Sequence, residues 1–330
     1  MRALLQRIAP VLQLTRVTTA FAAVANTWFV ILWTRVNPDE VSESTAFVPI
    51  RDRALWLLLA GGAASAVGLY AFGATLNDFL DANRDRALGR DRPLAAGRAS
   101  PELALTSIAG SLIVSALGAT VFGTPAVIMT LLLAGAVLAF NAAGRFVPAV
   151  GLVLLSVIYA GHMLVPNLGL RFLVPVWLVM THAVVIAGVT HWLARKTPSI
   201  SRRATGIAVG GWAVCSLVLL KLAWDRSEGD GLWPHWVPNT APVWPALLAL
   251  IFAALTLRRI SSLGAGPRAA DKISRYGALW LPLYACAWLF GAAQFEAAVL
   301  MGVLAVVGLL GMTVLREAYN LLEHPVAYRR

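Results

Sequence analysis

The sequence predicts an all-α protein, a multi-span transmembrane bundle of nine or ten helices. Hydrophobic residues make up 59% of the chain and charged residues only 13%, and the mean hydropathy is +0.73. A soluble domain of 330 residues is much less apolar. The apolar residues also gather in runs of about 20, the length at which an α-helix crosses the hydrocarbon core of a bilayer. Together these observations predict an integral membrane protein.

The apolar runs follow one another with connections too short for a separate soluble domain. We therefore expect residues 1–330 to form a single integral-membrane domain. Residues 1–14 place their large apolar side chains on one helical face, which predicts a helix lying in the membrane interface. Segments 124–141 and 243–257 fit the spanning length less well, so we expect nine or ten spans. In order, the runs lie at residues 15–34, 54–76, 102–122, 124–141, 146–166, 172–193, 204–224, 243–257, 276–292 and 295–315.

The net charge of +11 follows the membrane pattern. Basic residues concentrate in every second connection, as they do in cytoplasmic loops. A nucleic-acid-binding protein would instead gather them in one patch, so we expect no nucleic-acid partner. The pattern places the N-terminus and segment 77–101 in the cytoplasm, and we expect the cytoplasmic membrane of a bacterium. Six of the 27 basic residues fall on the other side, namely Arg35, Arg51, Arg53, Arg171, Lys221 and Arg226.

Three carboxylates end the second apolar run. At 100° per residue, Asp78, Asp81 and Asp85 share one helical face, with Asn77 beside them. Charge beside a membrane usually has a function. Hard cations such as Mg²⁺ prefer carboxylate oxygens and keep waters that a substrate phosphate can replace. This face therefore predicts a site for a metal and a diphosphate, with a solvated helix end as the alternative interpretation.

The acidic face runs directly into a basic segment. Residues 86–98 alternate arginines with aspartate, and a diphosphate needs both groups, carboxylates to hold divalent cations and guanidinium groups to bind the remaining phosphate oxygens. Ser100 and Pro101 then predict the cap and first turn of the next helix. We interpret segments 77–101 and 194–203 as the two functional cytoplasmic loops.

At residues 77–85 the chain reads Asn-Asp-x-x-Asp-x-x-x-Asp, and at residues 92–98 it reads Arg-Pro-Leu-x-x-Gly-Arg. In both motifs it resembles the UbiA-type intramembrane prenyltransferases. The resemblance is weaker elsewhere, with Arg16 at the head of the first span and with Phe140, Asn141 and Arg145 after the fourth. It implies a helical bundle with a central cavity, in which Mg²⁺ binds the diphosphate of an isoprenoid. It further implies that Asp78, Asp81 and Asp85 are catalytic metal ligands, supported by Asn77, and that Arg92 and Arg98 contact phosphate.

The family's second acidic motif is missing here. Segment 194–203 holds Arg195, Lys196, Arg202 and Arg203 and has no carboxylate. Two interpretations remain open: Arg195 and Lys196 contact the diphosphate directly in place of a metal, or the chain has kept the fold and lost catalysis. His191 lies four residues before Arg195 and would face the same cytoplasmic mouth.

Other polar and aromatic residues lie within or between the spans. For His162 and His182 we expect hydrogen bonds between helices. For Asn26, Asn141 and Asn167, cavity lining and bonding between helices are both open. Four tryptophans around segment 225–244 predict an aromatic belt at the membrane interface: Trp224, Trp233, Trp236 and Trp244.

The leading hypothesis is a Mg²⁺-dependent prenyltransferase that moves a prenyl group from an isoprenoid diphosphate to a hydrophobic or aromatic acceptor in the lipid membrane. The resemblance to the family and the segment at 77–98 carry this hypothesis. The alternative is a noncatalytic membrane protein that binds or moves an isoprenoid lipid, which the missing acidic motif favours. An ion or solute transporter fits the spans, but the chain has no row of charges within them.

Overall fold

The computed structural model describes residues 10–37, 50, 52–227, 229 and 231–323. Within them the chain is helical and has no β-strand. One helix, α10 (Pro267–Gly291), is 25 residues long and contains Pro282 in its interior. The α-helices are α2 (Phe21–Val36), α3 (Leu55–Ala87), α4 (Pro101–Ala119), α5 (Thr124–Ala142), α6 (Pro148–Leu164), α7 (Val174–Leu193), α8 (Arg202–Asp225), α9 (Val243–Leu263), α10 (Pro267–Gly291) and α11 (Phe295–Glu323).

Each of these helices covers one of the ten predicted apolar runs. Seven are long and apolar enough to cross a membrane by length and composition, and α2 and α6 are shorter apolar helices. The interfacial helix predicted for residues 1–14 lies mostly outside the described residues, although residues 10–15 are helical. The predicted multi-span helical bundle is therefore confirmed as a fold.

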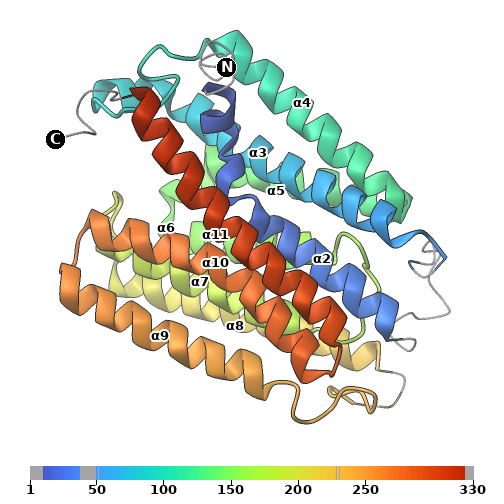
Figure 1. Ribbon diagram of the computed structural model, residues 1–330. Coiled ribbons are helices and arrows are strands. Elements are labelled where there is room, and N and C mark those ends of the chain that lie inside the picture. Colours follow the sequence, from blue (N-terminus) through green and yellow to red (C-terminus); the bar gives the residue numbers. More distant parts are fainter. Residues whose placement is uncertain (1–9, 38–49, 51, 228, 230, 324–330) are drawn as a thin grey trace.

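The helices pack side by side along a common direction (Figure 1). Helix α2 contacts α3, α6, α10 and α11, so it lies between the α3–α5 group and the α7–α10 group. Helices α3 and α4 pack most closely, because glycine and serine let their backbones approach. A Cβ on Gly68 would lie 2.6 Å from the Ser111 carbonyl oxygen, and Ser115 Oγ donates to the Ser65 carbonyl at 2.8 Å.

Local signals fix several helix ends. Ser100 Oγ accepts a hydrogen bond from the Leu103 N–H at 3.2 Å, and Pro101 occupies the first turn of α4, as predicted. Helix α3 does not end with the apolar run at residue 76 but continues to Ala87. Its 33 residues make it about 50 Å long, more than the bilayer core of about 30 Å. The extra length carries the acidic motif as helix.

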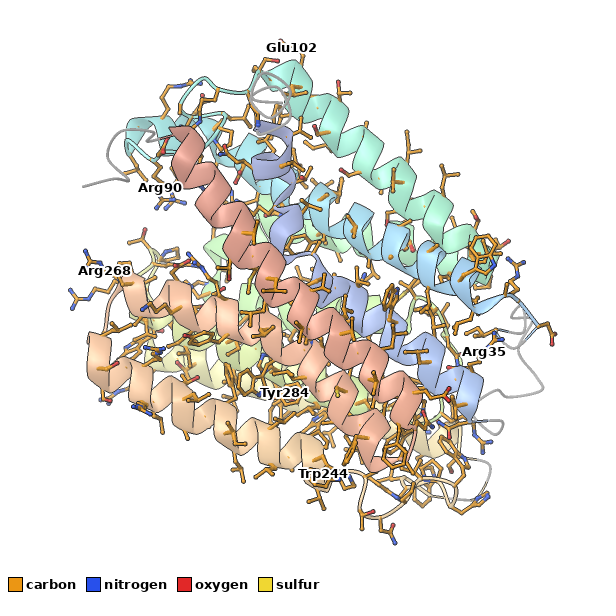
Figure 2. The ribbon with its side chains drawn as sticks, in the orientation of Figure 1. Arg35, Arg90, Glu102, Trp244, Arg268 and Tyr284 are labelled. Atoms are coloured by element: carbon orange, nitrogen blue, oxygen red, sulfur yellow. The ribbon has the colours of Figure 1, made fainter. Side chains whose placement is uncertain are left out.

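Arginines lie at both ends of the bundle, and aromatic side chains cluster near one of those ends. Figure 2 shows Arg90 and Arg268 at one end and Arg35 toward the other. Near Arg35, Trp33 stacks on Phe172 with ring centroids 5.6 Å apart, and Trp236 lies 6.1 Å from Trp33. Trp233 packs edge-on against Phe172. Trp224 and Trp244 are exposed, as an aromatic belt requires, whereas Trp233 and Trp236 are half-buried and pack against the core, so the aromatic-belt prediction stays a prediction for these two.

Candidate functional site: a carboxylate and arginine cluster at a central cavity

The three predicted aspartates face inward from the last turns of α3. Their exposed fractions are 2% for Asp78, 6% for Asp81 and 0% for Asp85. The spacing of three and four residues puts them on one side of a continuous helix, as expected. The solvated-helix-end interpretation is therefore wrong. Buried carboxylates need compensating charge, because removing an unpaired ion from water costs several kcal/mol.

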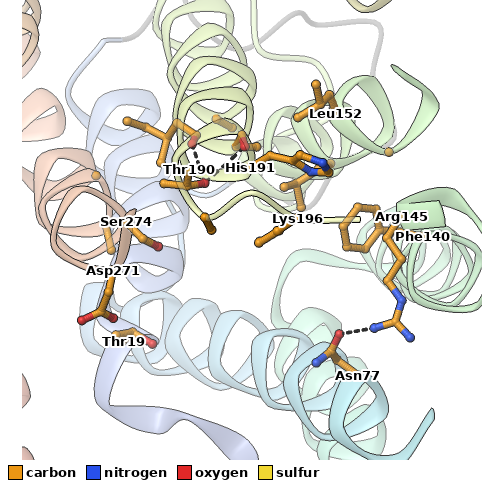
Figure 3. Close-up of a pocket in the computed structure, with 18 of the residues that line it drawn as sticks. Thr19, Asn77, Phe140, Arg145, Leu152, Thr190, His191, Lys196, Asp271 and Ser274 are labelled. Atoms are coloured by element: carbon orange, nitrogen blue, oxygen red, sulfur yellow. Dashed lines mark hydrogen bonds between the residues drawn. The ribbon is translucent and has the colours of Figure 1, made fainter. Parts of the chain in front are cut away.

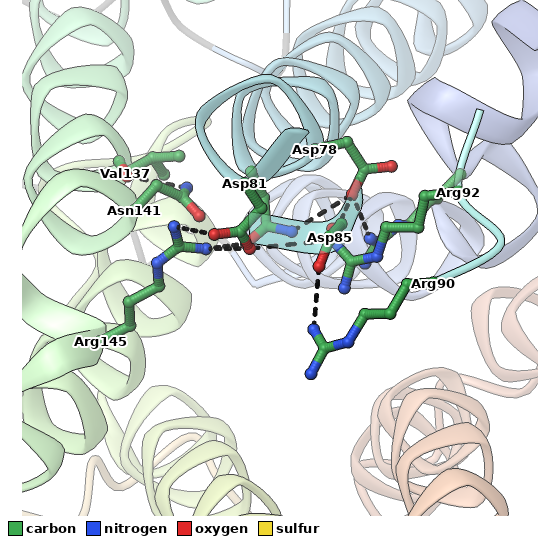
Figure 4. Close-up of polar contacts among 10 residues, drawn as sticks. Asp78, Asp81, Asp85, Arg90, Arg92, Val137, Asn141 and Arg145 are labelled. Atoms are coloured by element: carbon green, nitrogen blue, oxygen red, sulfur yellow. Dashed lines mark hydrogen bonds and ion pairs between the residues drawn. The ribbon is translucent and has the colours of Figure 1, made fainter. Parts of the chain in front are cut away.

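Arginines from other elements supply that charge (Figure 4). Arg145 binds Asp81 with two parallel hydrogen bonds of 2.6 and 2.7 Å, and it also donates to Asn77 Oδ1 at 2.6 Å. Arg16 Nη2 donates to Asp78 Oδ1 at 2.7 Å. Asn77 completes the contact by donating to Asp78 at 3.3 Å.

Arg92 contacts all three carboxylates. Its Nη1 lies 2.9 Å from Asp78, 3.8 Å from Asp81 and 3.0 Å from Asp85. The backbone explains how a residue of the following loop reaches back. Gly89 ends α3 with a φ of +60°, and the Arg90 N–H returns to the Asp85 carbonyl at 2.9 Å.

The same turn brings Arg90 to Asp85, with Nη1 and Oδ1 3.0 Å apart. A second turn with Gly97 at a φ of +71° sends the chain back toward α4. Arg98 lies beyond this turn, where it pairs with Asp91 at 2.6 Å, and it is not among the residues that line the large cavity. Of the two arginines predicted to contact phosphate, only Arg92 therefore lies at the carboxylate cluster.

A cavity of about 700 Å³ opens beside this cluster, between α3, α5 and α6 on one side and α7 and α10 on the other. Its charged end is strongly basic. Two aspartates, Asp81 and Asp271, line it together with eight cationic residues: Arg16, Arg84, Arg90, Arg92, Arg145, Arg195, Lys196 and Arg275. Its inner part is lined by apolar and aromatic side chains, among them Leu155, Tyr159 and Leu281. The shape combines a site for a polyanion with room for an apolar tail.

The loop after α7 forms the opposite side of this mouth. Arg195 adopts a φ of +48°, and the Lys196 N–H returns to the His191 carbonyl at 3.2 Å, which ends the helix. Figure 3 shows Lys196 reaching into the space across from Asn77 and Arg145. Partial burial, together with the positive charges of Arg90, Arg92 and Arg16, lowers the pKa of Lys196. A cationic side chain in such a field gains from a bound anion.

The relation predicted for His191 and Arg195 needs correction. Helix α7 ends at Leu193, so the two residues are not neighbours on one helical turn. Both nevertheless line the cavity, and His191 Nε2 lies 2.9 Å from the Pro198 carbonyl oxygen. His182 contacts the Gly277 carbonyl oxygen at 3.0 Å and the Tyr284 hydroxyl at 3.4 Å, which confirms its predicted bonding between helices.

The donor chemistry of the three aspartates suits Mg²⁺, but their arrangement does not. Among the described residues, no group of three or more aspartate, glutamate, histidine or cysteine side chains is placed to hold a metal ion. Asp81 turns toward Arg145, whereas Asp78 and Asp85 turn toward Arg92. Guanidinium groups therefore occupy the positions that a cation would take, and the metal-ligand assignment stays a prediction.

Sequence reasoning left Arg16, Arg90 and Arg145 out of the candidate site. Arg145 lies 64 residues from its partner Asp81, and the packing of α5 against α3 brings them together. Its signals in the sequence are its place in the short connection between two apolar runs and the weak family resemblance that it shares with Phe140 and Asn141.

Comparison with known proteins gives structural matches only. No family model and no curated protein sequence matches the chain. A solved digeranylgeranylglyceryl phosphate synthase structure matches 87% of this chain and 99% of its own, with 15% identity and a TM-score of 0.49. A UbiA homologue from Aeropyrum pernix K1 matches 88% and 96%, with 17% identity and a TM-score of 0.44. A UbiA homologue from Archaeoglobus fulgidus bound to DMAPP and Mg²⁺ matches 92% and 99%, with 15% identity and a TM-score of 0.42.

Proposed function

We propose that this chain is an intramembrane prenyltransferase that moves a prenyl group from an isoprenoid diphosphate to a hydrophobic or aromatic acceptor. The observation that carries the proposal is the cavity, because one end is lined by eight cations and the other by apolar side chains. A prenyl diphosphate has the matching polarity. Its diphosphate fits the end near Arg92 and Lys196, and its tail fits the inner part.

The proposed reaction requires stabilisation of the diphosphate leaving group. The allylic C–O bond breaks, the electron pair leaves with the diphosphate, and the resulting carbocation is captured by the acceptor, which then loses a proton. Arg92, Arg195 and Lys196 would stabilise the charge that develops on the diphosphate, as preorganised donors do. The apolar wall would keep the cation away from water.

Mg²⁺ dependence is part of the proposal and is tested separately. When bound, Mg²⁺ supplies positive charge to the diphosphate, and Asp78, Asp81 and Asp85 are the residues with the donor chemistry to hold it. Each already pairs with an arginine, so Mg²⁺ entry requires the guanidinium groups to move. The proposal therefore assigns the first charge stabilisation to arginine and lysine.

The first experiment measures binding of radiolabelled geranyl diphosphate to purified protein in nanodiscs, with Mg²⁺ or with EDTA. Lys196→Gln removes one charged contact and should weaken binding about tenfold or more. Arg258→Gln is the matched control, because Arg258 is exposed and does not line the cavity. Equal losses in the two variants would refute a specific diphosphate site. Binding only with Mg²⁺ would support the Mg²⁺ dependence of diphosphate binding, and equal binding in EDTA would refute it.

The second experiment separates the enzyme from the alternative, a noncatalytic protein that binds or moves an isoprenoid lipid. The missing acidic motif at 194–203 favours this alternative. Membranes from cells expressing the wild type or Asp81→Asn would be compared by lipid mass spectrometry. An enzyme predicts a prenylated product that is present only with the wild type. Prenyl diphosphate binding without any such product would establish the alternative.

A further inference from the structure

A second cavity of about 250 Å³ lies deeper in the bundle, between α2, α3, α5 and α6. We call it the inner chamber. It shares part of its wall with the large cavity, because Tyr70, Phe140, Leu155 and Tyr159 line both. Apolar residues such as Leu69, Val137 and Ile158 make up most of the remaining wall.

The inner chamber extends far from the charged end. Along α6, His162 lies 14 residues after Pro148, which begins the helix at that end, so it is about 21 Å farther along the helix axis. Arg16 is the charged residue that lines the chamber, and it is engaged at the mouth by Asp78. The deep part is therefore neutral.

Two buried polar atoms in this wall have no hydrogen-bond partner. They are Asn26 Nδ2 and His162 Nε2, and the exposed fractions of the two residues are 3% and 6%. Native proteins rarely leave such groups unsatisfied, because each removed from water without a partner is costly. The predicted bonding of His162 between helices is thus wrong for its Nε2. Asn141, in contrast, uses its side-chain amide to donate to the Val137 carbonyl at 3.0 Å.

We propose that the inner chamber binds a neutral, membrane-soluble ring compound through a carbonyl or phenolic oxygen. An amide nitrogen such as Asn26 Nδ2 can only donate, so the ligand must present an acceptor oxygen. The volume suits one or two rings. The shared wall would bring the ring next to the prenyl donor. The ring compound would then be the acceptor, and this role rests on the proposed prenyl transfer.

The test is photolabelling with tritiated benzophenone, whose ketone is both the hydrogen-bond acceptor and the photoreactive group. Wild-type protein in nanodiscs should show saturable labelling in peptides of α2, α3, α5 and α6, without any prenyl diphosphate. Diphenylmethane has the same two rings and no oxygen, and it should compete more weakly than unlabelled benzophenone. Asn26→Leu should raise the half-saturating concentration about fivefold, as expected for loss of one buried hydrogen bond.

Two further variants keep the test decisive. Ala74→Phe fills the chamber from α3 without removing a polar group and should abolish saturable labelling. Asn167→Leu is the matched control, because it replaces another buried asparagine by leucine. Asn167 donates to Thr34 Oγ1 and lines neither cavity, so labelling should be unchanged. Labelling that is non-saturable, or that resists both Asn26→Leu and Ala74→Phe, would overturn the proposal. Because no prenyl diphosphate is present, chamber labelling and diphosphate binding can each fail while the other succeeds.

Discussion

Breaking the pair between Arg145 and Asp81 should be one of the most damaging single changes at the site. The side chains are 16% and 8% exposed, and two short hydrogen bonds join them. Arg145→Met leaves Asp81 buried, with the nearest remaining cation, Arg92, 3.8 Å away. Loss of one partner of a buried pair costs about 3–5 kcal/mol. Because Arg92 stays close, we expect the lower end, about 3 kcal/mol.

The assay is a double-mutant cycle read by thermal unfolding in detergent. A loss of about 3 kcal/mol corresponds to a fall in Tm of roughly 6 °C for a chain of this size. Asp81→Leu should also destabilise, because it leaves Arg145 without its carboxylate. The double variant removes both charges and should recover about 2 kcal/mol or more relative to the sum of the single changes. Additivity within about 0.5 kcal/mol would refute the claim that burial makes this pair interdependent.

The remaining predictions concern packing, protonation and capping. Gly68→Ala should cost about 1–3 kcal/mol by pushing α3 from α4, whereas Gly110→Ala, with open space around its Cβ, should not destabilise; thermal unfolding compares them. The folded pKa of Lys196 is lowered from 10.5, so the folded chain binds fewer protons there and stability should rise as pH increases through the interval just below 10.5. Lys196→Met should remove that rise in unfolding scans across pH. Ser100→Ala should cost about 1 kcal/mol, and an unchanged Tm would contradict its capping role.

Periodicity and the motifs predicted the parts of the site that one continuous element controls. Asp78, Asp81 and Asp85 share a face because α3 stays helical through Ala87, and spacing alone is sufficient for that. Hydropathy likewise located α2 to α11 within the part of the chain that the structure describes. The apolar run to residue 76 predicted the membrane span but did not mark the end of α3, because the helix continues to Ala87, past the length of the bilayer core.

Contacts between distant elements could not be predicted in this way. Arg92 and Arg98 begin and end one motif. The turn at Gly97 directs the chain so that Arg92 contacts the α3 carboxylates, whereas Arg98 pairs with Asp91. Arg195 has a helical spacing from His191, but α7 ends before it. In the sequence, His162 lies among apolar residues, as a packing residue would. Its Nε2 has no partner because it faces a cavity whose other walls come from α2, α3 and α5.

The missing acidic motif and the basic cavity have one physical explanation. Under the proposed function, Arg195 and Lys196 would supply the positive charge that a second acidic loop would otherwise supply by holding metal ions. The three aspartates pair with four arginines, Arg16, Arg90, Arg92 and Arg145, so the cluster needs no further positive charge from the 194–203 loop. That surplus focuses a positive potential on the cavity mouth. Asp78→Asn would therefore free Arg16 and Arg92 for a phosphate and should tighten diphosphate binding in EDTA, whereas a diphosphate held only through metal ions predicts weaker binding.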